Sequence, residues 1–462
     1  MTLPPNATDH NTSTLASINP YDGSVVGEVN ITPGDRVPAV VSQARRAQPA
    51  WGAMSLDDRR DALRPLGRLI QDQADEFARL ITREMGKPIN ESKGEIDAVV
   101  GSFAHKLDAI VEALSPEQLD DGTTRSTIFY DPFDVCACIT PWNFPLLMPH
   151  WLVIPALMAG NAVVLKPSEQ TPIVAQRYAE ALNGLLPADI LRVVHGRDDQ
   201  GKALVASEVD LICFTGSRET GKHIMTAAGS GLKRVILELG SKDPLVVLED
   251  ADVTAAARFA ATNSFRNAGQ VCVSTERVYV PKAIAEPFIK ELVRASGEIV
   301  IGNGLDDSTA LGPMVNARQR DHVLKQIDDA VAHGAQIAFG HTGHHDNFVM
   351  PTVLTNVTHD MDIARTETFG PVACVITVDD EDQAVTLAND SEFGLGAVVF
   401  GEPGHASEVA RRLHAGMIGV NKSVGGARGA PWVGARQSGY GYHASRDGHR
   451  QFCQPRVVSW AK

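Results

Sequence analysis

The sequence has little positive charge, few cysteines and no long apolar run. Its 42 lysines and arginines are outnumbered by 56 aspartates and glutamates, which gives a formal net charge of −14. Neutralising nucleic-acid phosphates requires clustered basic residues, so this balance disfavours a nucleic-acid partner. No stretch approaches 18 uninterrupted apolar residues, and we therefore expect no membrane span. The polar N-terminus lacks a basic region followed by an apolar run, which disfavours a signal peptide and favours the cytoplasm.

The six cysteines are too few, in 462 residues, for a disulfide scaffold and indicate a reducing compartment. Cys136 and Cys138 form a C-x-C pair, but no second cysteine pair or paired histidines accompany it. Their alternation with apolar residues over 135–139 is typical of a buried strand. We predict no metal site there, and we interpret the histidine-rich segment 341–345 as a solvated turn.

From about residue 130 onward, short apolar runs alternate with helical segments. This pattern predicts βαβ units and parallel sheets. The first expected sheet consists of residues 135–139, 162–165, 190–194, 211–214 and 235–239, and the second of residues 245–248, 277–280, 372–378, 397–400 and 417–420. Segments 123–130 and 456–460 are expected to be edge strands, which a partner subunit often covers. We therefore predict an α/β fold with two parallel sheets.

Residues 216–223 (Gly-Ser-Arg-Glu-Thr-Gly-Lys-His) follow an expected strand and approach the phosphate-loop pattern. That loop requires serine or threonine after the lysine, because the hydroxyl holds magnesium, and here the residue is His223. The segment thus disfavours an NTPase, although a Gly-Ser turn at a helix N-terminus still suits a pyrophosphate. No G-x-G-x-x-G follows an expected strand, which disfavours a standard Rossmann dehydrogenase.

Three other segments place polar side chains near strand ends. Asn143 lies between prolines and aromatic residues, and its amide suits either a structural turn or an oxyanion. Lys166 and Glu169 suit either a ribose or a surface ion pair. Glu238, flanked by two leucines, is expected to be partly desolvated, and this raises a carboxyl pKa towards the range of a general base.

One cysteine, Cys272, has unusual neighbours. The preceding residues 266–271 (Arg-Asn-Ala-Gly-Gln-Val) include glycine, amides and small side chains, which leave room for a substrate. Structural cysteines usually lie in apolar surroundings, where burial raises the thiol pKa and makes the thiol inert. Taken alone, this segment fits either a core cysteine or a nucleophile.

Together these segments resemble the NAD(P)-dependent aldehyde dehydrogenase superfamily, from about residue 18 to the end of the chain. The motifs are, in order, Trp-Asn-Phe-Pro at 142–145, Lys-Pro-Ser-Glu at 166–169, Phe-Thr-Gly-Ser at 214–217, Leu-Glu-Leu-Gly at 237–240, Gly-Gln-Val-Cys at 269–272 and Glu-Thr-Phe-Gly-Pro at 367–371. The resemblance implies the oxidation of an aldehyde to a carboxylic acid. It also implies a variant dinucleotide site, which accounts for the missing G-x-G-x-x-G.

The resemblance assigns the chemistry to three residues. Cys272 is expected to attack the aldehyde, giving a thiohemiacetal and then a thioester. The side-chain amide of Asn143 and the backbone N–H of Cys272 are expected to hold the oxyanion. Glu238 is expected to activate the hydrolytic water, and its presence favours hydrolysis over transfer to coenzyme A. A non-catalytic relative would be expected to lack one of the three.

Cofactor contacts carry over in the same way. The expected cofactor residues are Trp142, Lys166, Glu169, Gly216, Ser217, Leu239, Glu367 and Phe369. Lys166 and Glu169 match residues that hold the adenosine ribose. A carboxylate at Glu169 accepts a hydrogen bond from the 2′-hydroxyl but repels a 2′-phosphate, so we predict NAD rather than NADP.

The resemblance leaves the substrate open between a general aldehyde and a semialdehyde such as succinate semialdehyde. Arg266 matches an arginine that succinate-semialdehyde dehydrogenases use for the distal carboxylate, but Trp151 replaces their second arginine. The candidate substrate residues are Arg266, Phe144, Leu147, Trp151 and Trp432, with Arg428 as a secondary candidate.

The resemblance also divides the chain into domains. Residues 1–17 are expected to form a flexible arm, 18–115 and 133–240 an NAD-binding domain, and 241–440 a catalytic domain. Residues 116–132 and 441–462 match the oligomerisation elements of the family, so we expect a homodimer or a homotetramer.

Overall fold

The first sheet follows the predicted runs. In the computed structural model, which describes residues 13–341, 343 and 345–462, five parallel strands and one short antiparallel edge strand form this sheet. Its order is β18 (Gly439–Tyr440), β9 (Arg234–Glu238), β8 (Leu211–Thr215), β5 (Val135–Ile139), β6 (Ala162–Lys166) and β7 (Leu191–Val193). The strand order reverses between β5 and β8. Ligands of open α/β sheets bind at such a reversal, outside the carboxyl ends of the strands.

Successive side chains of β5 enter two different cores, because neighbouring residues of a strand point to opposite faces. Cys136 and Cys138 pack beneath one set of helices, whereas Val135, Ala137 and Ile139 pack beneath the other. The predicted buried strand is confirmed. The helices of the second face are α1 (Val37–Gly52), α9 (Asp198–Ala206) and α10 (Arg218–Gly229).

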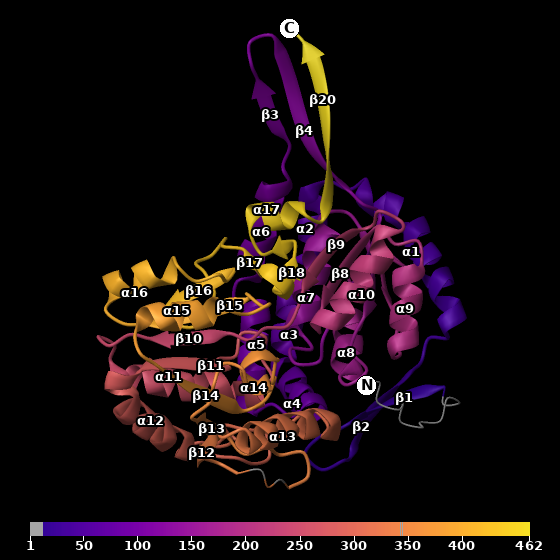
Figure 1. Cartoon of the computed structure of the whole chain (residues 1–462). Helices are drawn as coiled ribbons and strands as arrows, with labels where there is room; N and C mark the ends of the chain where they lie inside the picture. Colours follow the sequence, from indigo (N-terminus) through magenta and orange to yellow (C-terminus); the bar gives the residue numbers. More distant parts are fainter. Residues whose placement is uncertain (1–12, 342, 344) are drawn as a thin grey trace.

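The face that carries the cysteines is covered by the N-terminal helices and by two helices between strands (Figure 1). These helices are α2 (Leu56–Leu63), α3 (Leu66–Asp72), α4 (Ala74–Met85), α5 (Ile89–Val100), α6 (Phe103–Leu114), α7 (Leu147–Met158) and α8 (Pro172–Asn183). The Glu95 carboxylate of α5 accepts the backbone N–H groups of Leu146 and Leu147, each at 2.9 Å, and so caps α7. Lys87 pairs with Glu95 at 2.7 Å in the same buried site.

The second sheet also contains all five predicted runs. Its order is β12 (Gln336–Phe339), β13 (Thr352–Thr355), β14 (Val372–Val378), β11 (Arg277–Pro281), β10 (Pro244–Val247), β15 (Gly396–Phe400) and β16 (Met417–Val420). Its helices are α11 (Val253–Phe265), α12 (Lys282–Gly297), α13 (Ala317–Ala332), α14 (Asp362–Arg365), α15 (Glu381–Asn389) and α16 (Pro403–Ala410). The strands β12 and β13 extend the sheet beyond the prediction.

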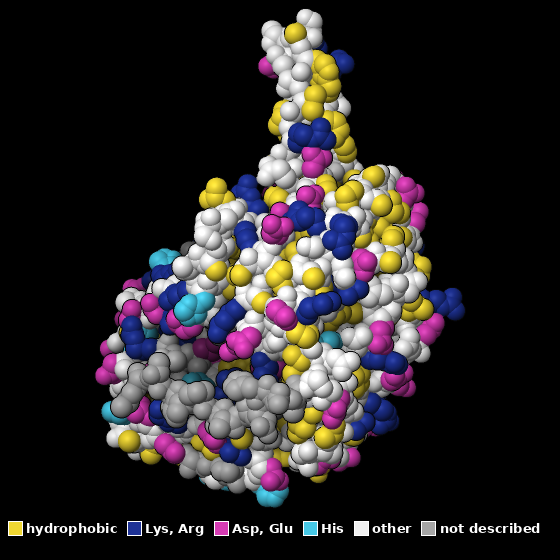
Figure 2. Space-filling model, turned by 90° about the vertical axis from the view of Figure 1, so that its right-hand side faces the viewer, with side chains coloured by type: hydrophobic (Ala, Val, Ile, Leu, Met, Phe, Trp, Pro, Cys, Tyr) yellow, Lys and Arg dark blue, Asp and Glu magenta, His cyan; other side chains and the backbone are white. Residues whose placement is uncertain are grey.

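A three-stranded ribbon projects from the body of the protein (Figure 1). It consists of β3 (Glu117–Asp120), β4 (Thr124–Pro132) and β20 (Cys453–Ala461), with β4 in the middle. Figure 2 shows hydrophobic side chains along this ribbon, and Leu119, Val457 and Trp460 are each at least half exposed. An exposed apolar edge of this kind is suited to pairing with another chain.

Two predicted boundaries differ from the structure. The flexible arm is a wrong prediction for residues 14–17, because β1 (Thr14–Ile18) pairs antiparallel with β2 (Val25–Asn30) and buries Leu15 and Ser17. The boundary at residue 440 falls between β18, which joins the first sheet, and β19 (Tyr442–His443), which pairs with β17 (Trp432–Val433). A short helix, α17 (Arg446–Arg450), then packs on α6 before the ribbon strand. None of the helices within the described residues is both long and apolar enough to cross a membrane.

Candidate functional site

The strand order brings most of the predicted residues to one edge of the first sheet. The carboxyl end of β5 leads to Trp142 and Asn143, that of β6 to Lys166 and Glu169, that of β8 to Gly216 and Ser217, and that of β9 to Glu238 and Leu239. This edge contains the reversal between β5 and β8, where parallel strands leave room for a ligand. Residues that are more than ninety positions apart in the sequence thereby lie in one site.

The Cys272 loop reaches this edge through an unusual backbone. Asn267 and Ala268 have φ values of 52° and 54°, in the left-handed region that side chains rarely occupy. Gly269 also has a positive φ of 70°, and a Cβ there would overlap the carbonyl oxygen of Gly370. The Gln270 side chain fixes the turn, since its Nε2 donates to the Asn267 carbonyl at 3.0 Å. Such strain persists where surrounding contacts determine the loop, and here it presents a half-buried Cys272.

Asn143 is bonded directly to that loop. Its side-chain Nδ2 donates to the backbone carbonyl oxygen of Gln270 at 3.0 Å, and the backbone carbonyl oxygen of Asn143 accepts from Asn267 Nδ2 at 3.3 Å. A side-chain amide has two N–H donors. The bond to Gln270 uses one of them and leaves the other for a ligand beside Cys272.

Glu238 lies near Cys272, and the residue is 7% exposed. Burial first, and then the charges of Glu238, Asp243 and Glu367, raise the pKa of the Cys272 thiol far above its usual value, while Arg266 lowers it. The free protein therefore holds Cys272 as a neutral thiol. Activation requires a group that accepts the proton or offsets these negative charges.

Glu238 also contacts a residue that the sequence does not single out. The Nε2 atom of His443 pairs with a Glu238 carboxylate oxygen, and the imidazole is 2% exposed. The position of His443 follows from β19, which runs beside the first sheet after β18. No local pattern around Tyr442-His443 signals this contact.

The segment Glu367–Phe369 approaches from the second sheet. A Glu367 oxygen accepts the backbone N–H of Ser241 at 2.8 Å, and the Phe369 ring contacts the Trp142 ring with centroids 5.5 Å apart. Phe369 has a φ of 50°. Burial raises the pKa of Glu367 to about 8, with the charge of Glu276 adding to the effect.

A buried ion pair that the sequence did not reveal holds this segment. Glu276 accepts the backbone N–H groups of Thr368 and Phe369, each at 2.8 Å. Lys242 donates to Glu276 at 2.6 Å and to the Thr368 hydroxyl at 2.9 Å. Both charged side chains are almost completely buried. The pair therefore fixes the backbone of residues 368 and 369.

Several of the residues expected to contact the cofactor have the chemistry that a dinucleotide site requires. Ser217 caps α10, with its Oγ accepting the backbone N–H of Thr220, and the free N–H groups of that helix end suit a pyrophosphate. A Cβ at Gly216 would overlap the Phe214 ring, so only glycine allows the backbone to run this close. Burial lowers the pKa of Lys166, and the charge of Glu169 offsets part of that effect.

Four of the five candidate substrate residues belong to α7 or lie next to it. Trp151 contacts the Trp432 ring at 5.5 Å and the His443 ring at 5.3 Å. Leu147 is the first residue of α7. Lys87 Nζ lies over the Phe144 ring, 4.0 Å from its centroid. This aromatic surface thus reaches from the loop after β5 to the partner of Glu238.

Arg266 lies elsewhere. Its side chain is exposed and lines a groove of about 610 Å³ with residues of α5, α11 and α12. Cys272, Trp151 and Trp432 do not line that groove. The secondary candidate Arg428 is exposed in the loop before β17.

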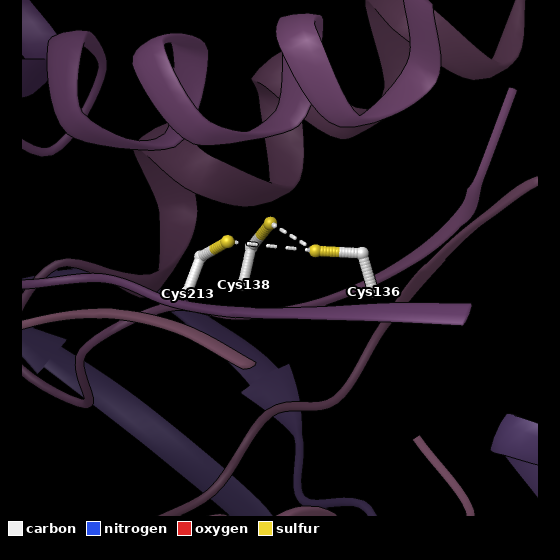
Figure 3. Close-up of side chains that lie close together, drawn as sticks. All are labelled: Cys136, Cys138 and Cys213. Atoms are coloured by element: carbon white, nitrogen blue, oxygen red, sulfur yellow. Dashed lines mark hydrogen bonds between the residues drawn. The ribbon is translucent and has the colours of Figure 1, made fainter. Parts of the chain in front are cut away.

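A cluster of three thiols lies in the core behind the first sheet (Figure 3). Cys136 Sγ is 3.8 Å from Cys138 Sγ and 3.6 Å from Cys213 Sγ, and all three residues are completely buried. The C-x-C spacing places two thiols on one face of β5, and the register with β8 adds the third. Figure 3 shows the three side chains directed towards the helices on one side of the sheet, with their sulfur atoms together. Burial raises the pKa of Cys136 and Cys213.

Comparison with known proteins places this site in context. Residues 7–458 match the model of the aldehyde dehydrogenase family. The chain is 38% identical to betaine aldehyde dehydrogenase 1 of Rhizobium meliloti, over 92% of this chain and 90% of that protein. It is 35% identical to an NADP(+) succinate-semialdehyde dehydrogenase of Escherichia coli, over 94% and 92% of the two chains. A crystal structure of betaine aldehyde dehydrogenase from Staphylococcus aureus in complex with NAD+ superposes with a TM-score of 0.93 at 33% identity, covering 97% of this chain and 92% of that one.

Proposed function

Because the chain belongs to the aldehyde dehydrogenase family, which oxidises aldehydes with NAD, we propose that Cys272 is its nucleophile. The single observation that carries this proposal is the junction of the Asn143 amide, the Cys272 loop and Glu238 at one strand edge. Of the six cysteines, Cys272 is the one that is not buried. Its sulfur adds to the aldehyde carbon and forms a thiohemiacetal.

The oxyanion of that adduct needs donors beside the thiol. The second N–H of Asn143 and the backbone N–H of Cys272 supply them, and the bond from Asn143 to Gln270 holds the amide in place before substrate arrives. Donors arranged in advance stabilise a developing charge without reorganisation, and removal of one typically costs about 10²–10³ in rate.

Hydrolysis of the thioester requires a base. The charge of Glu238 raises the pKa of Cys272, so the carboxylate lies near the thiol, where it would act as the base for the hydrolytic water. The His443 ring lies against this carboxylate. The acid is then released and Cys272 is regenerated.

A bound NAD would supply the hydride acceptor for the oxidation of the thiohemiacetal. Trp142, Gly216, Ser217 and Leu239 would contact its pyrophosphate and nicotinamide parts. Lys166 and Glu169 would hold the adenosine ribose, and Glu367 and Phe369 the nicotinamide ribose. The Glu276–Lys242 pair keeps this last segment in position.

We expect NAD to be preferred over NADP, since the Glu169 carboxylate repels a 2′-phosphate. Relatives differ in this respect, because one is named as an NADP(+) enzyme and another is seen with NAD+. The test is kcat/KM for both cofactors with the wild type and with Glu169→Gln. A wild type that uses NADP equally well contradicts the proposal.

The substrate is proposed to be an aldehyde with a polar tail, because relatives act on betaine aldehyde, aminoaldehydes and succinate semialdehyde. Phe144, Leu147, Trp151 and Trp432 would form an apolar wall along its chain. Arg266, the contact expected from the sequence for a semialdehyde carboxylate, lies in the separate groove described above. An Arg266→Ala variant with an unchanged KM for succinate semialdehyde would remove that contact.

The main experiment is NADH formation from a panel of aldehydes, with Cys272→Ala and Asn143→Ala as variants. Cys272→Ala should be inactive, whereas Asn143→Ala should lose about 10²–10³ in kcat. No NADH from any aldehyde would refute the function. We also propose a cytoplasmic homodimer or homotetramer joined through the ribbon of β3, β4 and β20, which sedimentation of the full chain tests.

A further inference from the structure

A half-buried lysine without an acidic partner lies beside the aromatic wall. Lys106 projects from α6, and its Nζ is 5.9 Å from the centroid of the Trp151 ring. Within the described residues, no carboxylate pairs with Lys106, and burial is the sole influence that shifts its pKa, lowering it to about 7. Burying an ammonium without a counter-charge lowers the stability of the fold unless a ligand anion pairs with it.

Two histidines lie near Lys106. Burial first, and then the charge of Lys106, lower the pKa values of His150 and His449, so both imidazoles are uncharged. Each is at most 5% exposed, and within the described part of the chain His150 Nε2 and His449 Nδ1 have no hydrogen-bond partner. The elements α6, α7 and α17 bring these side chains together (Figure 1).

Contacts between aromatic side chains link Lys106 to the proposed catalytic site. Trp151 contacts both Lys106 and His443, and His443 contacts Glu238. Lys106 and Glu238 therefore lie at opposite ends of this chain of contacts. A substrate that followed the proposed apolar wall along Trp151 would bring its far end near the ammonium.

Resting on the function proposed above, we propose that Lys106 forms an anion subsite that binds a carboxylate at the far end of the aldehyde. The unpartnered imidazole nitrogens of His150 and His449 are available to donate to the same group. A cationic tail, such as that of betaine aldehyde, would be repelled there. The subsite thus selects semialdehydes of dicarboxylic acids over aminoaldehydes, and it lies at a different place from the groove of Arg266.

The test compares aldehydes of similar length and different tail charge. Succinate semialdehyde, glutarate semialdehyde, pentanal and betaine aldehyde are assayed with the wild type, Lys106→Met and Lys106→Arg. Lys106→Met keeps the length of the side chain without its charge. Lys290→Met, on the exposed face of α12, serves as the control for loss of one positive charge.

We expect Lys106→Met to lower kcat/KM for both semialdehydes by about ten- to hundredfold, the usual effect of losing a charged hydrogen bond. Turnover of pentanal should stay within about twofold, and Lys106→Arg should keep most of the semialdehyde activity. An equal loss for pentanal and the semialdehydes would show a structural role and overturn the subsite. A wild type that prefers betaine aldehyde to both semialdehydes would also overturn it. Activity on pentanal shows that the proposed function itself holds in either case.

Discussion

Glu238 can affect the resting Cys272 thiol in two ways, as a negative charge that raises the thiol pKa or as the base that removes the thiol proton, and one variant distinguishes them. Glu238 is the first of three carboxylates whose charge raises the pKa of the thiol. If it acts on the resting thiol only as a negative neighbour, Glu238→Gln should make Cys272 more reactive. If it removes the proton from the resting thiol, the same variant should make Cys272 less reactive. The arrangement around a half-buried thiol favours the first outcome.

The size of the effect follows from thiolate chemistry. Removing one nearby like charge lowers a pKa by about one to two units, and each unit multiplies the thiolate fraction about tenfold. A less basic thiolate is also a weaker nucleophile, with a Brønsted coefficient of about 0.4–0.5. The net gain is therefore about threefold to fourfold per unit. We expect the rate constant of thiol–disulfide exchange to rise about threefold to fifteenfold at pH 8.

The assay is exchange with the neutral disulfide 4,4′-dithiodipyridine, followed by absorbance, in the absence of aldehyde and NAD. Peptide mass spectrometry assigns the modified residue. Glu286→Gln, at an exposed position of α12, controls for the general loss of a negative charge. A slower reaction of Glu238→Gln than of the wild type would refute the reasoning and make Glu238 the base for Cys272 as well as for water.

Three further outcomes are expected. Under native conditions about one thiol per chain should react, and Cys272→Ala should abolish that reaction until denaturant exposes the five buried cysteines, as counted by absorbance. Glu276→Gln leaves Lys242 buried without its partner, so it should destabilise the protein by about 3–5 kcal/mol in urea unfolding and raise the KM for NAD, whereas an unchanged KM would contradict the positioning role. His405 has a raised pKa because Asp250 and Glu381 accept its hydrogen bonds. The contribution of His405 to the free energy of unfolding is therefore complete below the unfolded pKa near 6.5, and it is lost as pH rises through the higher folded pKa. For so exposed a site the loss should be about 0.5 kcal/mol. Urea unfolding of His405→Gln across the same pH range should not show it.

Local sequence patterns predicted the central strands of both sheets but not the strands with weak patterns. The ten runs chosen for the two sheets are strands, because β-rich segments between helices signal themselves within a few residues. The strands β12 and β13 carry weaker signals, and the polar composition of β1 hides the inward-pointing Leu15 and Ser17. Such alternation is short and becomes clear only when β2 is seen beside it.

The residues that sequence reasoning missed share a physical cause. His443, Glu276, Lys106 and Cys213 reach their partners across gaps of many residues, through sheet order and helix packing. Their own neighbours in the sequence carry no recurring spacing. The predicted residues, by contrast, lie in motifs at strand ends, where the chain itself fixes the direction in which a side chain leaves the sheet.

The site depends on contact between the two sheets, since neither holds the complete set of groups. The first supplies Asn143 and Glu238, and the second supplies Cys272 and Phe369. The bond from Asn143 to the Gln270 carbonyl and the contact of Trp142 with Phe369 join them. Because one N–H of Asn143 is bonded to the Gln270 carbonyl, the amide is held in the orientation in which its second N–H is available beside the Cys272 loop. The same bond that places the donor therefore also fixes the thiol, and the strained backbone at Asn267 and Ala268 is held by that shared constraint.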